Sequence, residues 1–158
     1  MEIYAYKSKR EIKRYFRWLI KRDRQGVFSA DILINNIENN IENIKNTNNI
    51  KNYFDKNHFD QIYLKNAGFL ACDSEWFSRY EEKIVCEIHE IFVNPEWRGI
   101  GIGSTLMNKT IEYASEKKRD ILELWVGEKN YRAIAFYQKF GFEVKDRANH
   151  WLRMTKFI

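Results

Sequence analysis

Residues 94–107 read NPEWRGIGIGSTLM, and three of the chain's seven glycines lie here on alternate positions. They follow a proline and an arginine, and they precede a run with the apolar spacing of a helix. Glycines at the start of a helix leave backbone N–H groups uncovered, and the positive end of the helix dipole favours an anion there. With the guanidinium of Arg98 beside it, this stretch predicts a phosphate-binding helix N-terminus after a strand and a turn.

Two other phosphate-binding loops do not match these letters. A dinucleotide-binding GxGxxG beginning at Gly99 would need glycine at Ser104, and one beginning at Gly101 would need glycine or alanine at Leu106. A Walker A loop needs a lysine directly before its serine or threonine, whereas Gly103 occupies that place. We therefore expect a pyrophosphate ligand but no ATP or GTP chemistry.

Length and composition limit the class of protein. The chain has 158 residues, of which 44% are hydrophobic and 31% charged, and we expect residues 1–158 to form a single domain. No apolar run is long enough to span a membrane, and the first residues do not resemble a secretory signal, so we expect a cytoplasmic protein. Cys72 and Cys86 stand apart from any CxxC pair, which favours buried thiols and no metal site. The net charge of +5 suits an anionic ligand, either nucleic acid or a cofactor phosphate.

The periodicity predicts an α+β (mixed α/β) domain in the order strand, two helices, three strands, helix, strand, helix and two strands. Ile34, Ile37, Ile41 and Ile44 keep the 3-4-3 spacing of the second helix, which we expect to pack on the sheet, although a dimer seam is an alternative. A turn is expected at 66–68, and the loop 74–82 carries aromatic residues that suit a lid or a pocket wall equally. The expected elements are strand 2–7, a basic helix within 10–24, the isoleucine helix, strands 61–65, 68–73 and 83–93, helix 104–118, strand 121–126, helix 130–140 capped by Gly141, and the hairpin 143–158.

The run Arg98-Gly99-Ile100-Gly101-Ile102-Gly103 matches R/Q-x-x-G-x-G/A, and here the chain resembles the GCN5-related N-acetyltransferases, the GNAT superfamily. Strand IHEIFVNPEW precedes it, an amphipathic helix follows, and the second block of the family, NYRAIAFYQKFGF, lies at the matching distance in residues 130–142. The resemblance implies a splayed, mostly antiparallel sheet flanked by about four helices. It also implies that acetyl-CoA is the cosubstrate and that no metal is required.

The resemblance assigns roles to individual residues. The pantetheine arm would lie between strands 84–93 and 121–126, beside the backbone of Ile91, Phe92 and Val93. Asn130 matches the family's asparagine near the pantetheine, and Tyr137 matches the tyrosine beside the thioester sulfur, with an ordinary core aromatic as its alternative. The pyrophosphate would contact the residues of the glycine-rich run, namely Arg98, Gly99, Ile100, Gly101, Ile102, Gly103 and Ser104.

An amine must lose a proton before it can attack a thioester, so a base near the thioester is useful. Strand alternation places Glu87, His89 and Ile91 on one face and Glu90 on the other. Branches of the family place their base at positions that match Glu87 or His89. We expect Glu87 as the base, directly or through water, and His89 as relay or second candidate. The alternative is that Glu87 pairs with a lysine or arginine across the sheet and that His89 merely lines the cleft. Backbone near Ile91 would stabilise the oxyanion, and Tyr137 would protonate the leaving thiolate.

The acceptor is a primary amine that no motif identifies, either a small molecule or the N-terminus or a lysine of a peptide or protein. Trp125 stands where ribosomal-protein N-terminal acetyltransferases often carry a glutamate. It either walls the acceptor site or fills core, and we favour core. A non-catalytic module that binds acetyl-CoA, or nucleic acid through the basic first helix, is the alternative function. Nucleic acid is the less favoured partner because a basic helix face is usually a solvated surface. A homodimer is compatible with the chain.

Overall fold

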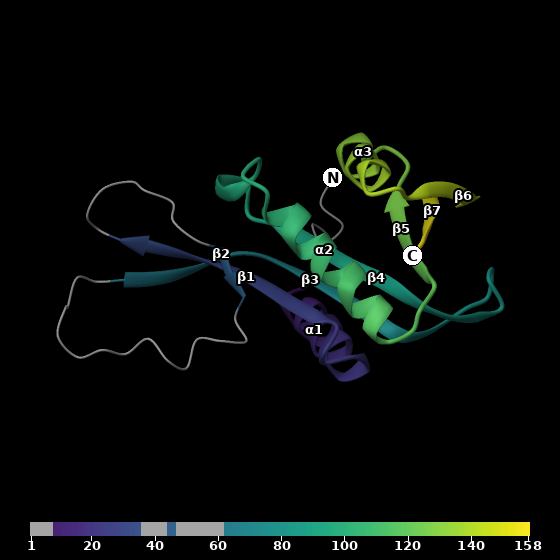
Figure 1. Ribbon diagram of the computed structural model, residues 1–158, viewed down its shortest axis with the longest axis horizontal. Helices are drawn as coiled ribbons and strands as arrows, with labels where there is room; N and C mark the ends of the chain where they lie inside the picture. The colour runs from purple at the N-terminus through teal and green to yellow at the C-terminus, as the bar shows by residue number, and fades with distance from the viewer. Residues whose placement is uncertain (1–7, 36–43, 47–61) are drawn as a thin grey trace.

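The computed structural model describes residues 8–35, 44–46 and 62–158 (Figure 1). The expected strand 2–7 lies outside these residues. Their three α-helices are α1 (Lys9–Arg22), α2 (Ile102–Glu116) and α3 (Tyr131–Lys139), and a short 3-10 turn, η2, covers Pro95–Trp97. The strands are β1 (Val27–Asn35), β2 (Ile44–Asn46), β3 (Ile62–Ser78), β4 (Lys83–Val93), β5 (Ile121–Gly127), β6 (Glu143–Ala148) and β7 (Trp151–Phe157).

The described strands form one seven-stranded sheet in the order β2-β1-β3-β4-β5-β7-β6. All neighbours are antiparallel except β4 and β5, which pair in parallel from Cys86↔Leu122 to Ile88↔Leu124. Within the described residues no β4–β5 pairing continues beyond that point, although β4 extends to Val93. The predicted splayed, mostly antiparallel sheet is therefore confirmed. In the described part of the chain, residues 90–93 of β4 pair with β3 on one side but have no strand partner on the β5 side.

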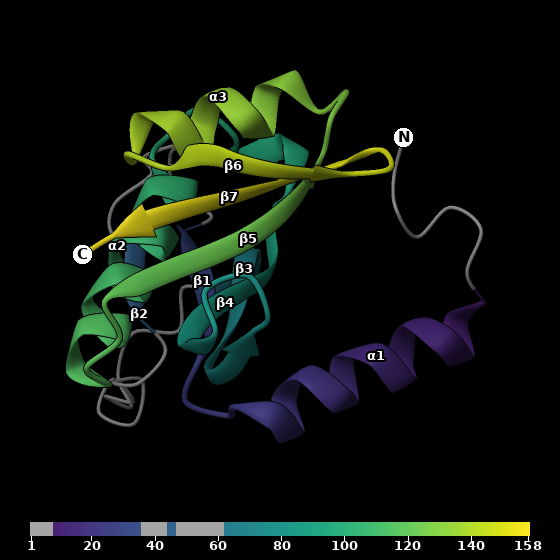
Figure 2. The same ribbon diagram turned by 90° about the vertical axis from the view of Figure 1, so that its right-hand side faces the viewer.

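Helices cover both faces of the sheet. The apolar face of α2 buries Leu106, Met107 and Ala114 against β1, β3, β4 and β5. Helix α1 lies on the opposite face, where Phe16 contacts Phe69 of β3 with ring centroids 5.4 Å apart (Figure 2). Helix α3 lies beside the β6–β7 hairpin in the same view. The fourth helix expected from the sequence is absent from the residues that the structure describes.

Strand β3 is longer than the sequence predicted, and two predictions are wrong here. It runs unbroken through residues 66–68, where a turn was expected, and through most of 74–82, where a loop was expected. Gly68 lets the backbones of β3 and β4 approach closely, because a Cβ at this position would lie 2.5 Å from the carbonyl oxygen of Phe92. The chain reverses only at residues 79–82.

The isoleucine helix is also wrong where it can be judged, because Ile34 lies in β1 and Ile44 in β2. Residues 36–43, with Ile37 and Ile41, lie outside the described part of the chain. A short run of β-branched residues suits a strand as well as a helix, and pairing of β1 with β3 over residues 27–35 decides between the two. The predicted basic helix is confirmed as α1. The predicted strands and helices from β4 through β7 are confirmed as well.

Candidate active site

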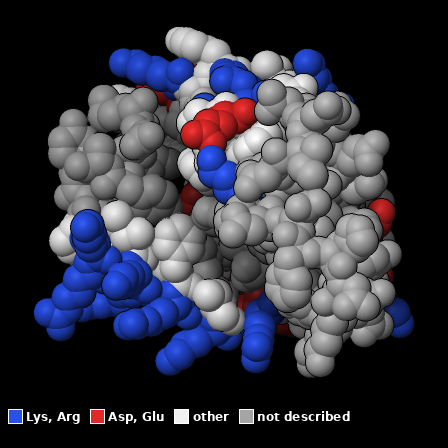
Figure 3. Space-filling model, turned by 90° about the vertical axis from the view of Figure 1, so that its left-hand side faces the viewer, with Lys and Arg blue, Asp and Glu red and all other residues white. Residues whose placement is uncertain are grey.

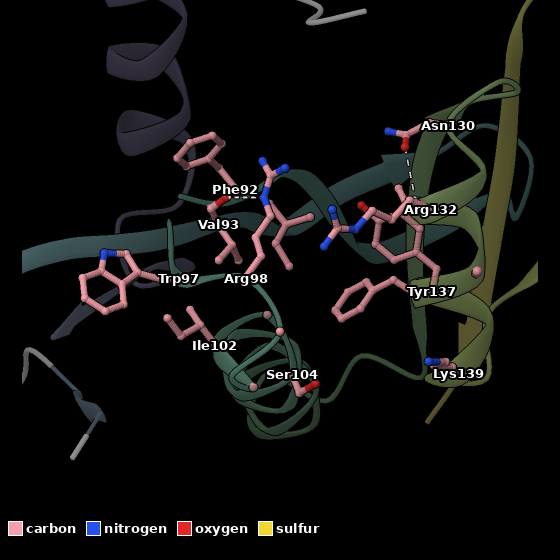
Figure 4. Close-up of a pocket in the computed structure, with 17 residues that line it drawn as sticks. Phe92, Val93, Trp97, Arg98, Ile102, Ser104, Asn130, Arg132, Tyr137 and Lys139 are labelled. Carbon is pink, nitrogen blue, oxygen red and sulfur yellow. Dashed lines mark hydrogen bonds between the residues drawn. The ribbon is translucent and has the colours of Figure 1, made fainter. Parts of the chain in front are cut away.

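A basic cavity of about 730 Å³ opens where β4 ends and α2 begins (Figure 4). Among the described residues, its lining includes the cations Arg98, Arg132 and Lys139 and no carboxylate. The guanidinium of Arg98 is oriented by a hydrogen bond of 2.9 Å from its Nε to the carbonyl oxygen of Val93. The lining residues are Ile91, Phe92, Val93, Trp97, Arg98, Gly99, Gly101, Ile102, Gly103, Ser104, Asn130, Arg132, Ala133, Ala135, Phe136, Tyr137 and Lys139.

The glycines make the floor of this cavity from bare backbone. Gly99 and Gly101 have φ of 89° and 95°, in the left-handed region, and a Cβ on either would meet nothing within 4 Å. Gly101 caps α2, whose first-turn N–H groups have no acceptor within the helix. Such a surface fits a pyrophosphate, because uncovered donors and the positive helix end face one open space. Ile100 is exposed and is the one predicted cofactor residue that does not line the cavity.

Arg132 and Lys139 were missed by sequence reasoning. They stand seven residues apart on α3, so they share one face of that helix. Figure 4 shows Arg132 reaching from α3 into the cavity. The i, i+7 spacing of two cations beside the phosphate loop was the signal that could have identified them.

An acidic cavity of about 380 Å³ adjoins the basic one. The two share Ile91, Asn130, Ala133 and Tyr137, so they meet in the gap between β4 and β5. The acidic cavity is lined by two carboxylates and no Lys or Arg among the described residues. Its remaining lining residues are Tyr15, Glu87, Ile88, His89, Glu90, Trp125, Val126, Gly127 and Trp151.

A β-bulge arranges the acidic side chains. Ala71 pairs with Glu90 and Cys72 with Ile88, which leaves His89 as the extra residue of β4. His89 contacts Trp18 of α1 with ring centroids 5.4 Å apart. The hydroxyl of Tyr15, also on α1, donates to Glu90 Oε1 at 3.0 Å. The predicted alternation is therefore wrong beyond Ile88, since His89 and Glu90 both face α1.

Glu87 is buried and lines the acidic cavity, and it lies opposite Glu123 in the β4–β5 register. Burial is the main cause that raises the pKa of Glu87 to about 9, and the neighbouring Glu123 adds to it. Glu87 Oε2 has no hydrogen-bond partner among the described residues. Across the sheet Arg153 pairs with Glu123 at 2.5 Å rather than with Glu87, so the expected alternative of a Glu87 ion pair is not what the structure shows.

His89 contacts a second indole ring, that of Trp76, with ring centroids 5.1 Å apart. Burial lowers the pKa of His89 to about 4, so the imidazole is neutral at pH 7. Its buried Nε2 has no hydrogen-bond partner in the described part of the chain. A neutral ring with a free nitrogen can accept a proton.

Tyr137 and Asn130 stand at the junction of the two cavities. Tyr137 is 7% exposed, and burial, with the charge of Glu90, raises the pKa of its hydroxyl, which keeps it protonated. Asn130 Oδ1 accepts a hydrogen bond of 3.3 Å from the backbone N–H of Ala133 and so caps α3. The side chain predicted to contact the cosubstrate therefore also begins the helix that carries Tyr137.

Three further residues bear on the chemistry. Cys72 and Cys86 are buried thiols, and neither lines a cavity. Trp125 lines the acidic cavity and contacts the ring of Tyr80, with ring centroids 5.6 Å apart, instead of filling core.

No group of His, Cys, Asp and Glu among the described residues could hold a metal ion. None of the described helices is both long and apolar enough to cross a bilayer. The cytoplasmic location stays a prediction.

The glycine-capped start of α2 and the short parallel pairing of β4 with β5 are the features that the resemblance to N-acetyltransferases predicts. Residues 38–142 match the sequence profile of the Acetyltransferase (GNAT) family. The chain belongs to this family, as its glycine-rich run and second block predicted.

Known proteins agree with this assignment. An uncharacterized N-acetyltransferase of Methanocaldococcus jannaschii is 43% identical over 155 residues, which are 98% of this chain and 55% of that protein. The chain thus spans about half the length of this relative. The crystal structure of PH1933 from Pyrococcus horikoshii OT3 matches all of this chain and 81% of its own, with a TM-score of 0.71 and 32% identity. The PaiA N-acetyltransferase of Thermoplasma acidophilum, in complex with coenzyme A, matches 60% of this chain and 55% of its own, with a TM-score of 0.51 and 25% identity.

Proposed function

We propose that this protein transfers the acetyl group of acetyl-CoA to a primary amine by direct attack in a ternary complex. The observation that carries the proposal is the junction at Tyr137, where a cavity with three cations meets a cavity with two carboxylates. The basic cavity suits the anionic phosphates of the cosubstrate, and the acidic cavity suits an ammonium. The structural relative with bound coenzyme A supports this choice of cosubstrate.

In this proposal the glycine-rich run binds the pyrophosphate through its backbone N–H groups and Arg98. Backbone groups of Ile91, Phe92 and Val93 that face away from β3 would hydrogen-bond the pantetheine amides, since these residues line the basic cavity where β5 has separated from β4. Asn130 would contact the same arm at the junction. The acetyl group then lies beside Tyr137, which both cavities share.

The residues of the acidic cavity would carry the proton transfers. Glu87, as carboxylate, takes a proton from the acceptor nitrogen, directly or through a water, and His89 is the second candidate or relay. The backbone N–H near Ile91 donates to the developing oxyanion. The hydroxyl of Tyr137 protonates the leaving thiolate, a role for which its raised pKa keeps the proton available. Because both cysteines lie in the core, neither is placed to form an acyl-enzyme.

The acceptor class follows from charge and shape. Glu87 and Glu90, together with the rings of Tyr15, Trp125 and Trp151, would bind a cationic amine through ionic and cation–π contacts. The amine of a small molecule, a peptide N-terminus or a protein lysine fits this description. A homodimer stays a prediction.

The test is release of free CoA from acetyl-CoA in the presence of spermidine, kanamycin, single amino acids and N-terminal peptides. Glu87→Gln and Tyr137→Phe are the matched variants, since each removes one proton-transfer group with little change in volume. Amine-dependent release that falls in both variants supports the proposal. Full turnover in Glu87→Gln and His89→Ala alike would show that neither side chain is the base.

A second candidate function is binding of nucleic acid without catalysis, and the surface of α1 favours it. Cations recur at i, i+4 spacing as Lys9, Lys13, Arg17 and Lys21, all exposed and without an ion pair in the described part of the chain. Figure 3 shows Lys and Arg side chains gathered along this edge. Adjacent like charges on a helix are unfavourable, so a polyanion would relieve their repulsion. Binding of RNA that weakens steeply with salt, with no amine-dependent CoA release, would favour this candidate.

A further inference from the structure

Two carboxylates meet in the sheet behind the acidic cavity. Glu87 of β4 and Glu123 of β5 are register partners in the parallel pair, and their side chains are 5% and 2% exposed. Two negative charges so close and so far from water repel strongly. The pair is therefore expected to hold one proton near neutral pH.

The surroundings of Glu123 favour its charged form. Its Oε2 accepts hydrogen bonds from Arg153 Nη1 at 2.5 Å and from Ser78 Oγ at 2.7 Å. Arg153 is itself held by Glu81 at 2.8 Å and by Asp146 at 2.7 Å, and its guanidinium lies 4.7 Å from the ring of Tyr80. These contacts hold the Arg153 guanidinium on the Glu123 side of the carboxylate pair. The negative charge of the pair therefore belongs on Glu123.

The surroundings of Glu87 favour its neutral form. Asp73 of β3 faces it in register and carries a charge that pairs with Arg22 of α1 at 2.6 Å. On the cavity side His89, Glu90, Tyr15 and Tyr137 are the titratable neighbours, and Glu90 shares the wall of the cavity. The charge of Arg153 favours the ionised form of Glu87, but the direct contact of Arg153 is with Glu123.

We propose that Glu87 and Glu123 share a single proton, which Arg153 and Ser78 direct onto Glu87 by holding the charge on Glu123. Glu123, Arg153 and Ser78 are then positioning residues, since they act through Glu87 and do not line either cavity. This inference rests on the proposed function for its catalytic meaning, but the proton sharing is a property of the chain alone.

The proton balance suits an acceptor that arrives as an ammonium. Its positive charge displaces the shared proton from Glu87 to solvent. The Glu87 carboxylate next takes one proton from the ammonium, and the free amine attacks the thioester carbonyl. As the C–S bond breaks, the sulfur takes the hydroxyl proton of Tyr137. The nitrogen of the new amide gives its surplus proton to the Tyr137 oxygen, so the hydroxyl is restored. Glu87 ends protonated, as it began, and each turnover releases one proton.

The experiment is a titration of the side-chain carboxyl carbon of Glu87, followed by ¹³C NMR in the full chain and assigned by its loss in Glu87→Gln. The pKa of about 9 in the parent chain should fall by about one unit or more in Glu123→Gln, because the repelling charge is gone. Glu81→Gln is the matched control, since Glu81 binds the same arginine without facing Glu87. Ser78→Ala is a milder variant that should also lower the pKa of Glu87.

The outcomes separate the two proposals. An unchanged Glu87 titration in both Glu123→Gln and Ser78→Ala overturns the proton sharing, as does an equal shift in Glu81→Gln. The pH profile of CoA release with the best amine of the panel is then read beside the NMR result. A shifted Glu87 titration with an unshifted rate profile upholds the sharing and removes Glu87 as the base. Parallel shifts of both support the inference and the proposed function together.

Discussion

The two cavities differ in how they are built. The basic cavity is made of short runs of residues from the end of β4, the glycine-rich turn, the start of α2 and the length of α3, and much of its floor is backbone. The acidic cavity is made of residues from α1, β4, β5, α3 and β7 that are distant in the sequence. A site for an invariant pyrophosphate can be local and made of main chain, whereas a site that selects an amine depends on side chains brought together by the fold.

The strongest test of this difference lies at the junction. Tyr137→Phe should lower kcat about 100-fold or more, because loss of general acid catalysis has effects of that order. The KM for acetyl-CoA should change little, since the ring and its packing remain. Tyr131→Phe on the same helix is the control, as Tyr131 is 74% exposed. Equal rates in the two variants would show that the Tyr137 hydroxyl takes no part.

Removing a cation should affect the basic cavity alone. Arg98→Ala should weaken acetyl-CoA binding about tenfold, the loss of one charge-assisted hydrogen bond. Isothermal titration at two salt concentrations should also show a smaller salt dependence. Arg79→Ala, which changes an exposed arginine outside both cavities, should leave the affinity unchanged. A raised KM for the amine in Arg98→Ala, with normal acetyl-CoA affinity, would reverse the assignment of the two cavities.

Backbone conformation should matter more in the basic cavity than elsewhere. Gly101→Ala places a Cβ on a left-handed residue and should lower the free energy of unfolding by about 1 kcal/mol, with weaker acetyl-CoA binding as well. Urea unfolding measures the first effect. Gly127→Ala is the control, because Gly127 has no positive φ and open space around its Cβ position. Equal losses in both variants would argue against a backbone-shaped phosphate site.

The smallest effect concerns acid stability on the acidic side. The folded chain holds the pKa of His89 at about 4 against 6.5 when unfolded, so between these values the unfolded chain binds a proton that the native chain does not. Acidification from pH 7 to pH 5 should therefore lower the melting temperature more in the parent chain than in His89→Gln. Identical pH dependence in the parent chain and in His89→Gln would show that His89 titrates as if exposed.

The residues that line the basic cavity were easier to locate from the sequence than those of the acidic one, because the basic cavity is built from local segments, and their binding roles stay predictions. The glycines, Arg98, Asn130 and Tyr137 lie in two short blocks, and each was expected in the region where the structure places it. Their spacing alone indicates a strand, a turn and a helix start. Ile100 was the exception, since it is exposed and does not line the cavity.

The acidic cavity was harder to predict because it depends on contacts between strands. The bulge at His89 arises from the register of β3 against β4, which no pattern within residues 83–93 reveals. The contact of Glu123 with Arg153 joins β5 to β7 across 30 residues of sequence. Ile34 and Ile44 were misjudged for the same reason, since β-branched residues at mixed spacing take the structure that their partners impose.

We propose that both substrates bind at once, in adjoining cavities, and react without a covalent enzyme intermediate. Initial rates measured over a grid of acetyl-CoA and amine concentrations test for this ternary complex. Double-reciprocal plots should give lines that intersect, because the amine attacks while acetyl-CoA is bound. Parallel lines, together with exchange of labelled CoA into acetyl-CoA in the absence of amine, would indicate an acetylated enzyme and contradict the account.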